Sequence, residues 1–281
     1  MTADVHLPDA TTFTKENRVP TIALDPPVRP VDDPSIRLSA TGQSFLLLVR
    51  TEVRKSLDTR SGRWVLAAIL LLCGASLGWD VLHAASEDVS FARYLGHAGQ
   101  PLLLLLPVVG ILAMTSEWSQ RTALTTFTLS PRRLRVLIAK MVGALLIALA
   151  TLAVVAAATA AATAVGSLLT DGPVSFDWSG KDAGGFVVAN LLNVLMGVSF
   201  GAVLPMTAVA LVAYFVAPTL FTVLSATVLA SFGQWLDVFA AFDRVSRFDG
   251  AHLGWTGTAL AVWVVVPVVL GLWSSNRREA K

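Results

Sequence analysis

The chain has one cysteine and few charged side chains. Cys73 is the single cysteine of its 281 residues, and only 14% of the residues are charged. One cysteine cannot form a disulfide within the chain, so a disulfide-stapled secreted domain is excluded. The low charge, with 54% hydrophobic residues and a mean hydropathy of +0.67, is far from the composition of a soluble domain of this length. The composition predicts a multi-spanning membrane protein.

The chain also lacks a phosphate-binding P-loop. That motif needs G-x-x-x-x-G-K-[ST], with glycines for the backbone cradle and a lysine for the phosphates. The one Gly-Lys pair is Gly180-Lys181, and Asp182 follows it. We therefore assign no catalytic residue, metal ligand or cofactor to this chain, and any ATP must be bound by another polypeptide. The net charge of +2 does not point to nucleic acid as a partner.

Long apolar runs are what the chain does contain. The hydrocarbon core of a bilayer is about 30 Å thick, and a helix needs roughly 20 residues to cross it. Six stretches meet this condition: about 64–82, 95–114, 136–169, two within 186–230, and 256–273. Pro205 and Pro218 are the expected turns within 186–230. The runs are continuous instead of alternating, which favours helices over a barrel. The fold class is therefore an all-α membrane protein with six transmembrane helices.

Basic residues sort the connecting segments into two sides. Cytoplasmic loops near membrane ends are enriched in lysine and arginine. Alternate segments carry most of them: Arg50, Arg54, Lys55, Arg60, Arg63, Arg121, Arg132, Arg133, Arg135, Lys140, Arg277, Arg278 and Lys281. The other segments hold Arg93, Lys181, Arg244 and Arg247 among a majority of acids. We expect both termini to be cytoplasmic, in the cell membrane.

Two segments precede the first span. Residues 1–36 are rich in proline and poor in large apolar side chains, which predicts a disordered cytoplasmic tail. In residues 37–63, Phe45, Val49, Val53 and Leu57 recur every four residues. This stripe, reinforced by Leu48, predicts an amphipathic helix on the membrane surface. Such a helix either anchors the first span or also forms part of a docking surface.

The insert at residues 117–140 lies between the second and third spans. Ser116 is the expected N-cap of a short helix with Glu117 in its first turn. Ser130-Pro131 is a second helix start, so a break is expected near Leu129. Anionic headgroups offer about 1 kcal/mol per basic residue, which explains the arginines without a partner.

At this point the chain resembles the permease subunits of type II ABC exporters. The resemblance rests on the amphipathic helix, the six spans and the insert motifs Glu117, Arg121-Thr122, Ser130-Pro131-Arg132-Arg133 and Ala139-Lys140. It covers the chain from about Arg37 onward, and the proline-rich tail departs from it.

The resemblance implies a function and partners. Residues 64–281 would be the permease domain of an exporter, with a coupling loop at 115–135 whose short helix, up to Leu129, sits on an ATPase subunit. An outer re-entrant segment would occupy 231–255. The implied ATPase interface comprises Glu117, Trp118, Arg121, Thr122, Phe127, Arg54 and Leu57. ATP and Mg would be bound by the ATPase, and the other partners would be membrane lipids and a second permease copy, identical or different.

Several polar residues occur within the spans. Asn190 and Asn193 share one face of the fourth span, and Thr219, Thr222 and Ser225 line up on the fifth. Hydrogen bonding between helices is one explanation, because an unpartnered amide in hydrocarbon costs several kcal/mol. The other explanation, which the resemblance implies, places these residues on the substrate path.

Three alternative functions stay open. An ATP-independent secondary carrier usually needs a carboxylate deep in a span, and Asp80 lies near the outer end of the first span. A non-transporting membrane anchor or sensor is the second. An intramembrane serine protease is suggested by G-x-S-x-G at residues 74–78 and 197–201. Both glycine pairs are better explained as small residues that allow close helix packing.

Overall fold

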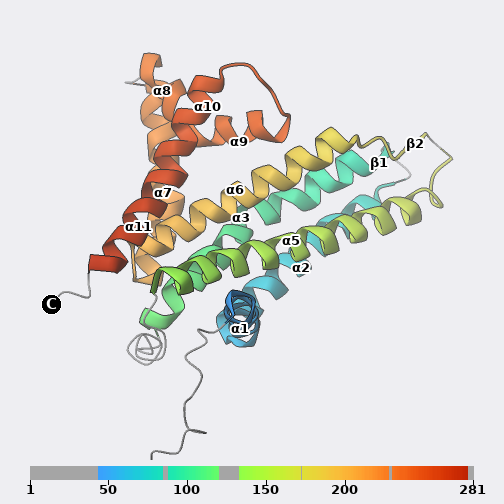
Figure 1. The fold of residues 1–281 in the computed structure, drawn as a ribbon. Coiled ribbons are helices and arrows are strands. Elements are labelled where there is room, and N and C mark those ends of the chain that lie inside the picture. Colours follow the sequence, from blue (N-terminus) through green and yellow to red (C-terminus); the bar gives the residue numbers. More distant parts are fainter. Residues whose placement is uncertain (1–43, 85–87, 120–132, 172, 228–229, 278–281) are drawn as a thin grey trace, which may run out of the picture. The chain divides into compact units, whose positions relative to one another are not determined.

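The computed structural model describes residues 44–84, 88–119, 133–171, 173–227 and 230–277. The chain divides into two compact units, residues 1–42 and 43–281, and all described residues lie in the second. The predicted tail at 1–36 therefore lies outside the described residues. The described part of the second unit is mostly helical (Figure 1), and 6 of the helices in it are long and apolar enough to cross a membrane. These helices are compatible with a multi-pass membrane protein, as the composition predicted.

Four long helices run side by side in Figure 1 and form the larger core. They are α2 (Arg60–Leu82), α3 (Phe91–Ser119), α5 (Arg133–Gly166) and α6 (Gly180–Val203). Ile69, Leu102, Leu106 and Val194, from α2, α3 and α6, are fully buried in this core. α3 lies in contact with α2, α5 and α6. It is therefore the central helix of this group.

Glycines bring α3 and α6 together. A Cβ added to Gly197 would lie 2.3 Å from the carbonyl oxygen of Pro107, and one added to Gly201 would lie 2.9 Å from that of Ile111. From the other side, a Cβ on Gly110 would lie 2.7 Å from the oxygen of Val194. The predicted packing role of the second glycine pair is confirmed. The same prediction is wrong within this chain for the first pair, Gly74 and Gly78 on α2. A Cβ added to either glycine would have no contact with another part of the described chain within 4 Å.

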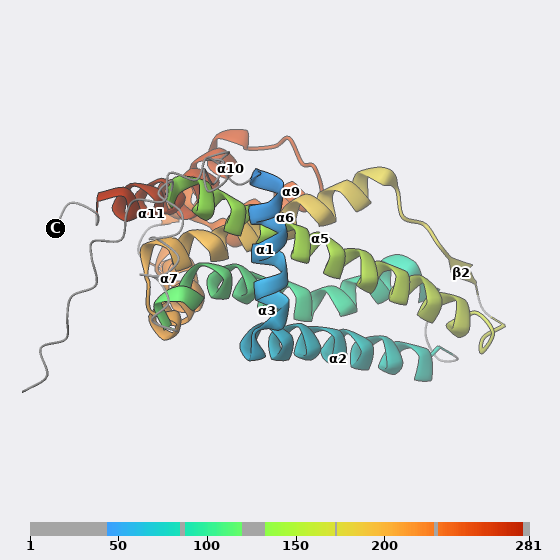
Figure 2. The ribbon, with the colours of Figure 1, turned by 60° about the horizontal axis from the view of Figure 1, so that its bottom comes forward.

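Helix α1 (Phe45–Asp58) lies across α2, α3 and α5 instead of alongside them (Figure 2). One residue, Thr59, separates it from α2. The Thr59 amide donates to Lys55 O (3.2 Å), ending α1, and its Oγ1 accepts from Gly62 N (3.2 Å), capping α2. Gly62 is required here, because a Cβ would lie 2.1 Å from the oxygen of Ser56. The predicted helix at 37–63 thus divides: 60–63 belong to α2 and 37–43 are not described.

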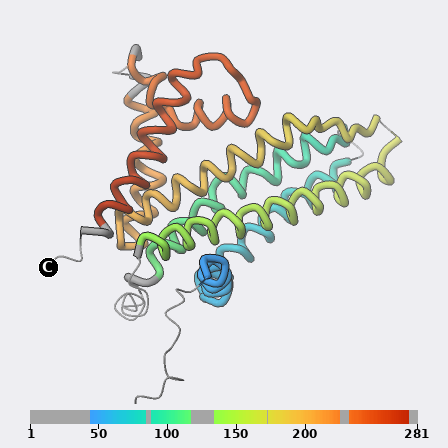
Figure 3. The backbone as a smooth tube through the Cα atoms, in the orientation of Figure 1, coloured from blue at the N-terminus to red at the C-terminus, as the bar shows by residue number. Residues whose placement is uncertain are grey.

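The remaining helices form a second group, inclined to the first in the tube drawing of Figure 3. α7 (Thr207–Thr227) follows α6 after a turn at the predicted Pro205. The turn predicted at Pro218 is wrong, because α7 continues through it. The sixth span is built from α10 (Leu253–Leu260), a π-helical turn at Ala261–Val265, and α11 (Val266–Arg277). Pro267 follows this turn; proline clashes with the carbonyl four residues before it, which a wider turn relieves.

The loops at the far end of the four-helix group are tied together. β1 (Val89–Ser90) pairs in parallel with β2 (Val174–Ser175), joining the α2–α3 and α5–α6 connections. Between α7 and α10 the chain forms two short helices, α8 (Ala230–Leu236) and α9 (Val238–Ser246). Asp237 caps α9 through Oδ1, which accepts from Ala240 N (3.0 Å). The segment expected to be re-entrant at 231–255 is thus helical over most of its length, and α9 packs against α6.

Candidate functional site

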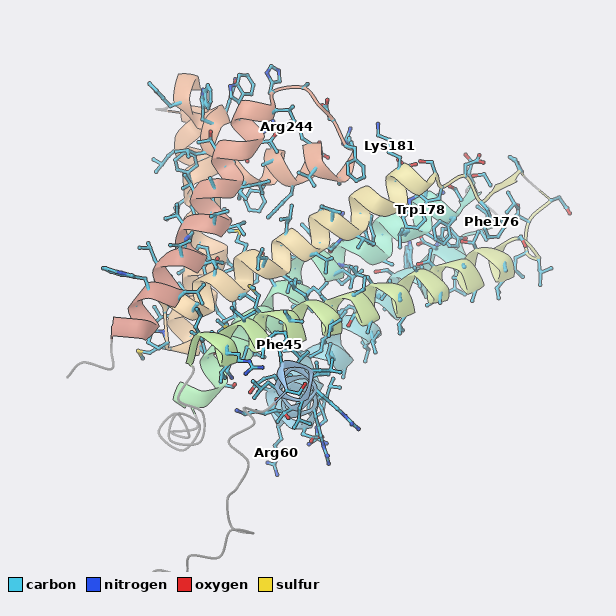
Figure 4. All side chains as sticks on the ribbon, in the orientation of Figure 1. Phe45, Arg60, Phe176, Trp178, Lys181 and Arg244 are labelled. Carbon is cyan, nitrogen blue, oxygen red and sulfur yellow. The ribbon has the colours of Figure 1, made fainter. Side chains whose placement is uncertain are left out.

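The predicted docking residues on α1 lie at its surface. Arg54 is exposed and pairs with Asp58 one turn later (3.5 Å). Leu57 is 42% exposed, and Leu46 and Leu47 are also exposed. Figure 4 shows Arg60, at the beginning of α2, pointing away from α3 and α5. This surface thus combines cations with apolar side chains, the composition expected at a membrane surface.

The apolar stripe of α1 faces protein for most of its length. Val49 is 4% exposed, and Val53 packs against the core of the four-helix group. Phe45 and Leu48 are half-buried. Leu57, the last residue of the stripe, is exposed and is not covered by another described helix of the chain. A helical wheel places the stripe correctly but does not say whether lipid or another helix covers it; here α5 covers much of it.

The predicted coupling segment is described only at its two ends. The prediction that a separate short helix begins after Ser116 is wrong, because α3 continues unbroken to Ser119. Glu117 and Trp118 therefore lie in the last turn of α3, and their side chains are not among those described. Arg121, Thr122, Phe127, Leu129 and Ser130-Pro131 lie outside the described residues, and α5 begins at Arg133.

Lys140 has a different environment from the one expected of an insert cation. Its side chain is 2% exposed and its Nζ donates to Glu52 Oε2 of α1 (3.0 Å), which is 12% exposed. Nζ also donates to the carbonyl oxygen of Ala113 in α3 (3.4 Å). The lysine thus joins α5 to α1 and α3. Its place inside the apolar run 136–169 was a signal for burial, but Lys140 was grouped with the basic residues of the insert.

A small cavity lies beside this ion pair. Residues of four helices line it, among them Glu52 and Ser56 of α1, Gly62 of α2, Ser116 of α3 and Ile147 of α5. Its volume of about 20 Å³ is close to the minimum that one water molecule requires. The end of the four-helix group that bears α1 is therefore closely packed and partly polar.

Two larger cavities lie between the two helix groups. The first, of about 350 Å³, is bounded by α3, α6 and α9, with Gln100, Asn190, Phe186, Phe239 and Asp243 in its walls. The second, of about 110 Å³, is bounded by α3, α6, α7 and α9. Leu103, Asn193, Phe239 and Phe242 line both, so the cavities are adjacent. We call them together the amide cavity.

The predicted path residues are only partly brought together. Asn190, Asn193 and Thr219 line the amide cavity. Thr222 does not line it and donates to the carbonyl oxygen of Pro218 in its own helix (3.1 Å). Ser225 lies in α7, but its side chain is not among those described.

Asn193 joins three helices. Its Nδ2 donates to Leu103 O of α3 (2.8 Å), and its Oδ1 accepts from the hydroxyl of Tyr214 in α7 (2.6 Å). Asn190 instead donates to Phe186 O of its own helix (2.9 Å), and its Oδ1 is buried with no partner among the described residues. The predicted interhelical hydrogen bond is therefore found for Asn193 and not for Asn190. Tyr214 was not predicted, because nothing in the sequence shows which helix faces Asn193.

Asp80 is more deeply buried than its place near the end of a span suggested. Its side chain is 1% exposed and lies 2.7 Å from Nδ1 of His97, which is half exposed. Its second oxygen, Oδ2, is buried without a partner in the described part of the chain. Burial of an incompletely paired carboxylate is costly, even near the end of a span. The described residues contain no group of three His, Cys, Asp or Glu side chains that could hold a metal ion.

The geometry thus offers two distinct places for function, the α1 end of the four-helix group and the amide cavity. A comparison of the chain with known protein families finds no matching family, and a comparison with curated proteins finds no match.

Proposed function

We propose that this chain is the membrane-spanning permease subunit of an ATP-driven exporter of the type II ABC class. Separate ATPase subunits, carrying ATP and Mg, would dock on the cytoplasmic side, and a second permease copy would complete the substrate path. Both termini would then face the cytoplasm.

The observation that carries the proposal is the position of α1. It packs on α5 and contacts α3, the two helices on either side of the insert. A partner that touches α1 would therefore also be close to both ends of the insert. If a separate ATPase moves the spans, we expect its docking surface to include a helix that rests directly on the helices to be moved.

The amide cavity supports the transport part of the proposal. Ligand sites are concave, mostly apolar and contain a few polar groups. The cavity combines Phe186, Phe239 and Phe242 with the amides of Gln100 and Asn190. It adjoins α7, of which a smaller share than of α3 is buried within the described part of the chain. Motion of α7 against α6 would change its volume.

Co-purification is the direct test. The chain is expressed with the ATPase encoded beside it, purified through a tag on the chain, and assayed for ATP hydrolysis. We expect a stoichiometric ATPase. A purified chain without one would refute the proposal.

Glu117 provides a sharper test of coupling. In a Cys73→Ser background, Thr219→Cys places a single thiol in the amide cavity. We expect its reaction with a maleimide to change when the ATPase is trapped with ATP and vanadate. Glu117→Ala should abolish that change while ATP hydrolysis continues, and Glu117→Asp should retain it. An unaltered nucleotide response in Glu117→Ala would remove the proposed role of Glu117.

A second candidate function is an ion-coupled carrier, which the Asp80–His97 pair favours. Ionisable residues within spans mark proton or ion pathways, and here the buried Asp80 contacts a half-exposed histidine. If the chain works alone, the reactivity of Thr219→Cys in vesicles without ATPase should respond to a pH gradient, and Asp80→Asn should abolish the response. No response to the gradient would dismiss this candidate.

A further inference from the structure

Helix packing alone does not account for the buried ion pair between Glu52 and Lys140. Their atoms lie 3.0 Å apart, with both side chains largely withdrawn from solvent, and Lys140 donates in addition to Ala113 O at 3.4 Å. Three helices meet at one ammonium group. Two of them, α3 and α5, are the helices on either side of the insert.

Lysine is an unfavourable residue for a buried position whose only role is to fill the space between helices. Taking two charges out of water is costly, and apolar side chains of similar volume often stabilise a protein as well or better. The neighbours of Lys140 in α5, Val136 and Ala139, are buried apolar residues. A charged pair, however, fixes the relative position of the helices. The ammonium group can donate to its acceptors on α1 and α3 only while these helices keep their places beside α5. Buried polar groups of this kind are known to set helix register.

α1 also contacts α5 beside the ion pair. At Gly143, one turn beyond Lys140, an added Cβ would lie 3.5 Å from Val53 Cγ2 and 3.6 Å from Glu52 Cβ. α1 therefore approaches α5 closely on the turn after the ion pair. Sliding α1 along α5 would separate Glu52 from Lys140 and leave the Glu52 carboxylate without its cation.

We propose that Lys140 is a positioning residue that fixes α1 on α3 and α5, so that α1 and the two helices bordering the insert move as one rigid unit. The value of this unit for coupling rests on the proposed function. The rigidity itself does not, and it can be measured without the ATPase.

Spin labels on α1 and α5 test the rigidity. In a Cys73→Ser background, Thr51→Cys on α1 and Leu134→Cys at the start of α5 place two labels on exposed positions. In lipid nanodiscs we expect one narrow distance distribution. Lys140→Met should broaden it, because Glu52 is left buried and unpaired. A narrow, unchanged distribution in Lys140→Met would overturn the proposal.

Two further variants separate positioning from general loss of stability. Adding Glu52→Gln to Lys140→Met removes the unpaired charge, so the double variant should broaden the distribution no further than Lys140→Met alone; additive broadening would contradict a direct pair. Asp58→Asn breaks the exposed Arg54–Asp58 pair on the same helix and should leave the distribution unchanged. If Lys140→Met does not reach the membrane, Glu52→Gln alone serves as the test, with the same expected broadening.

The complex with the ATPase adds a readout that a purely structural role would not move. With the pair intact, the distance between Thr51→Cys and Leu134→Cys should be the same without nucleotide and after trapping with ATP and vanadate. In the double variant it should differ between the two states. A nucleotide-dependent distance with the pair intact would overturn the rigid unit, whereas failure of any ATPase to co-purify would refute the proposed function and leave the nanodisc result standing.

Discussion

The two sides of α3 are built differently. Toward α6 the backbones meet at Gly110, Gly197 and Gly201, with no room for a methyl group. Toward α7 and α9 the same helix borders the amide cavity, of about 350 and 110 Å³. Packing contacts are lost across a void, and motion is easiest where few buried contacts resist it. We therefore expect α3 and α6 to stay together, and any relative motion of α7 and α9 to occur at the cavity.

The largest effect is expected from a substitution that forces α3 and α6 apart. Gly197→Ala would put a methyl group against Pro107 O, and we expect it to destabilise the protein by about 3 kcal/mol. Gly78→Ala is the matched control, because it enters open space on α2. Thermal unfolding can be followed with a thiol-reactive dye, since Cys73 is the single cysteine and is buried. Equal unfolding temperatures for the two variants would contradict the close contact.

A smaller effect is expected at the border between the two sides. Asn193→Leu removes both hydrogen bonds that link α6 to α3 and α7. We expect a loss of about 2 kcal/mol, since Tyr214 and Leu103 O are left unpaired. Asn190→Leu is the comparison, because its Oδ1 already lacks a partner among the described residues, and it should be neutral or stabilising. The same dye assay measures both, and a larger loss at Asn190 would reverse the assignment.

The smallest effect is expected inside the amide cavity. Gly96 lines it, and a Cβ added there would meet no atom within 4 Å. Gly96→Leu should change stability by less than about 1 kcal/mol, because the new side chain fills open space. If the cavity is the path, the nucleotide response of Thr219→Cys should nevertheless be reduced in this variant. A strong loss of stability would show that the space is not available.

Much of the fold followed from apolar run lengths. The six helices of membrane-spanning length and the turn at Pro205 were predictable, because a bilayer sets helix length and a proline cannot donate to the helix. The turn predicted at Pro218 was wrong because helices in apolar surroundings tolerate proline when no better hydrogen-bond partner is available to the chain. The end of α3 was misplaced for a similar reason: Ser116 is a good cap, but a helix already in progress continued through it.

The site was less predictable than the fold, because it depends on which helices face each other. Asn193 and Lys140 are both polar residues on apolar helices, and the sequence alone could not name Tyr214 or Glu52 as their partners. Lys140 was counted with the cytoplasmic cations of the insert, yet it is buried. The second glycine pair was predictable and the first was not, since spacing does not tell which face of a helix has a neighbour.

The junction at Thr59 has a mechanical consequence. α1 and α2 share this single residue, whose side chain and backbone bond to both helices, and Gly62 lets the end of α1 rest on the first turn of α2. No flexible linker separates α1 from α2 that could absorb a movement of α1. A displacement of α1 would therefore be passed directly to the first turn of α2, which would move together with α1 instead of independently of it.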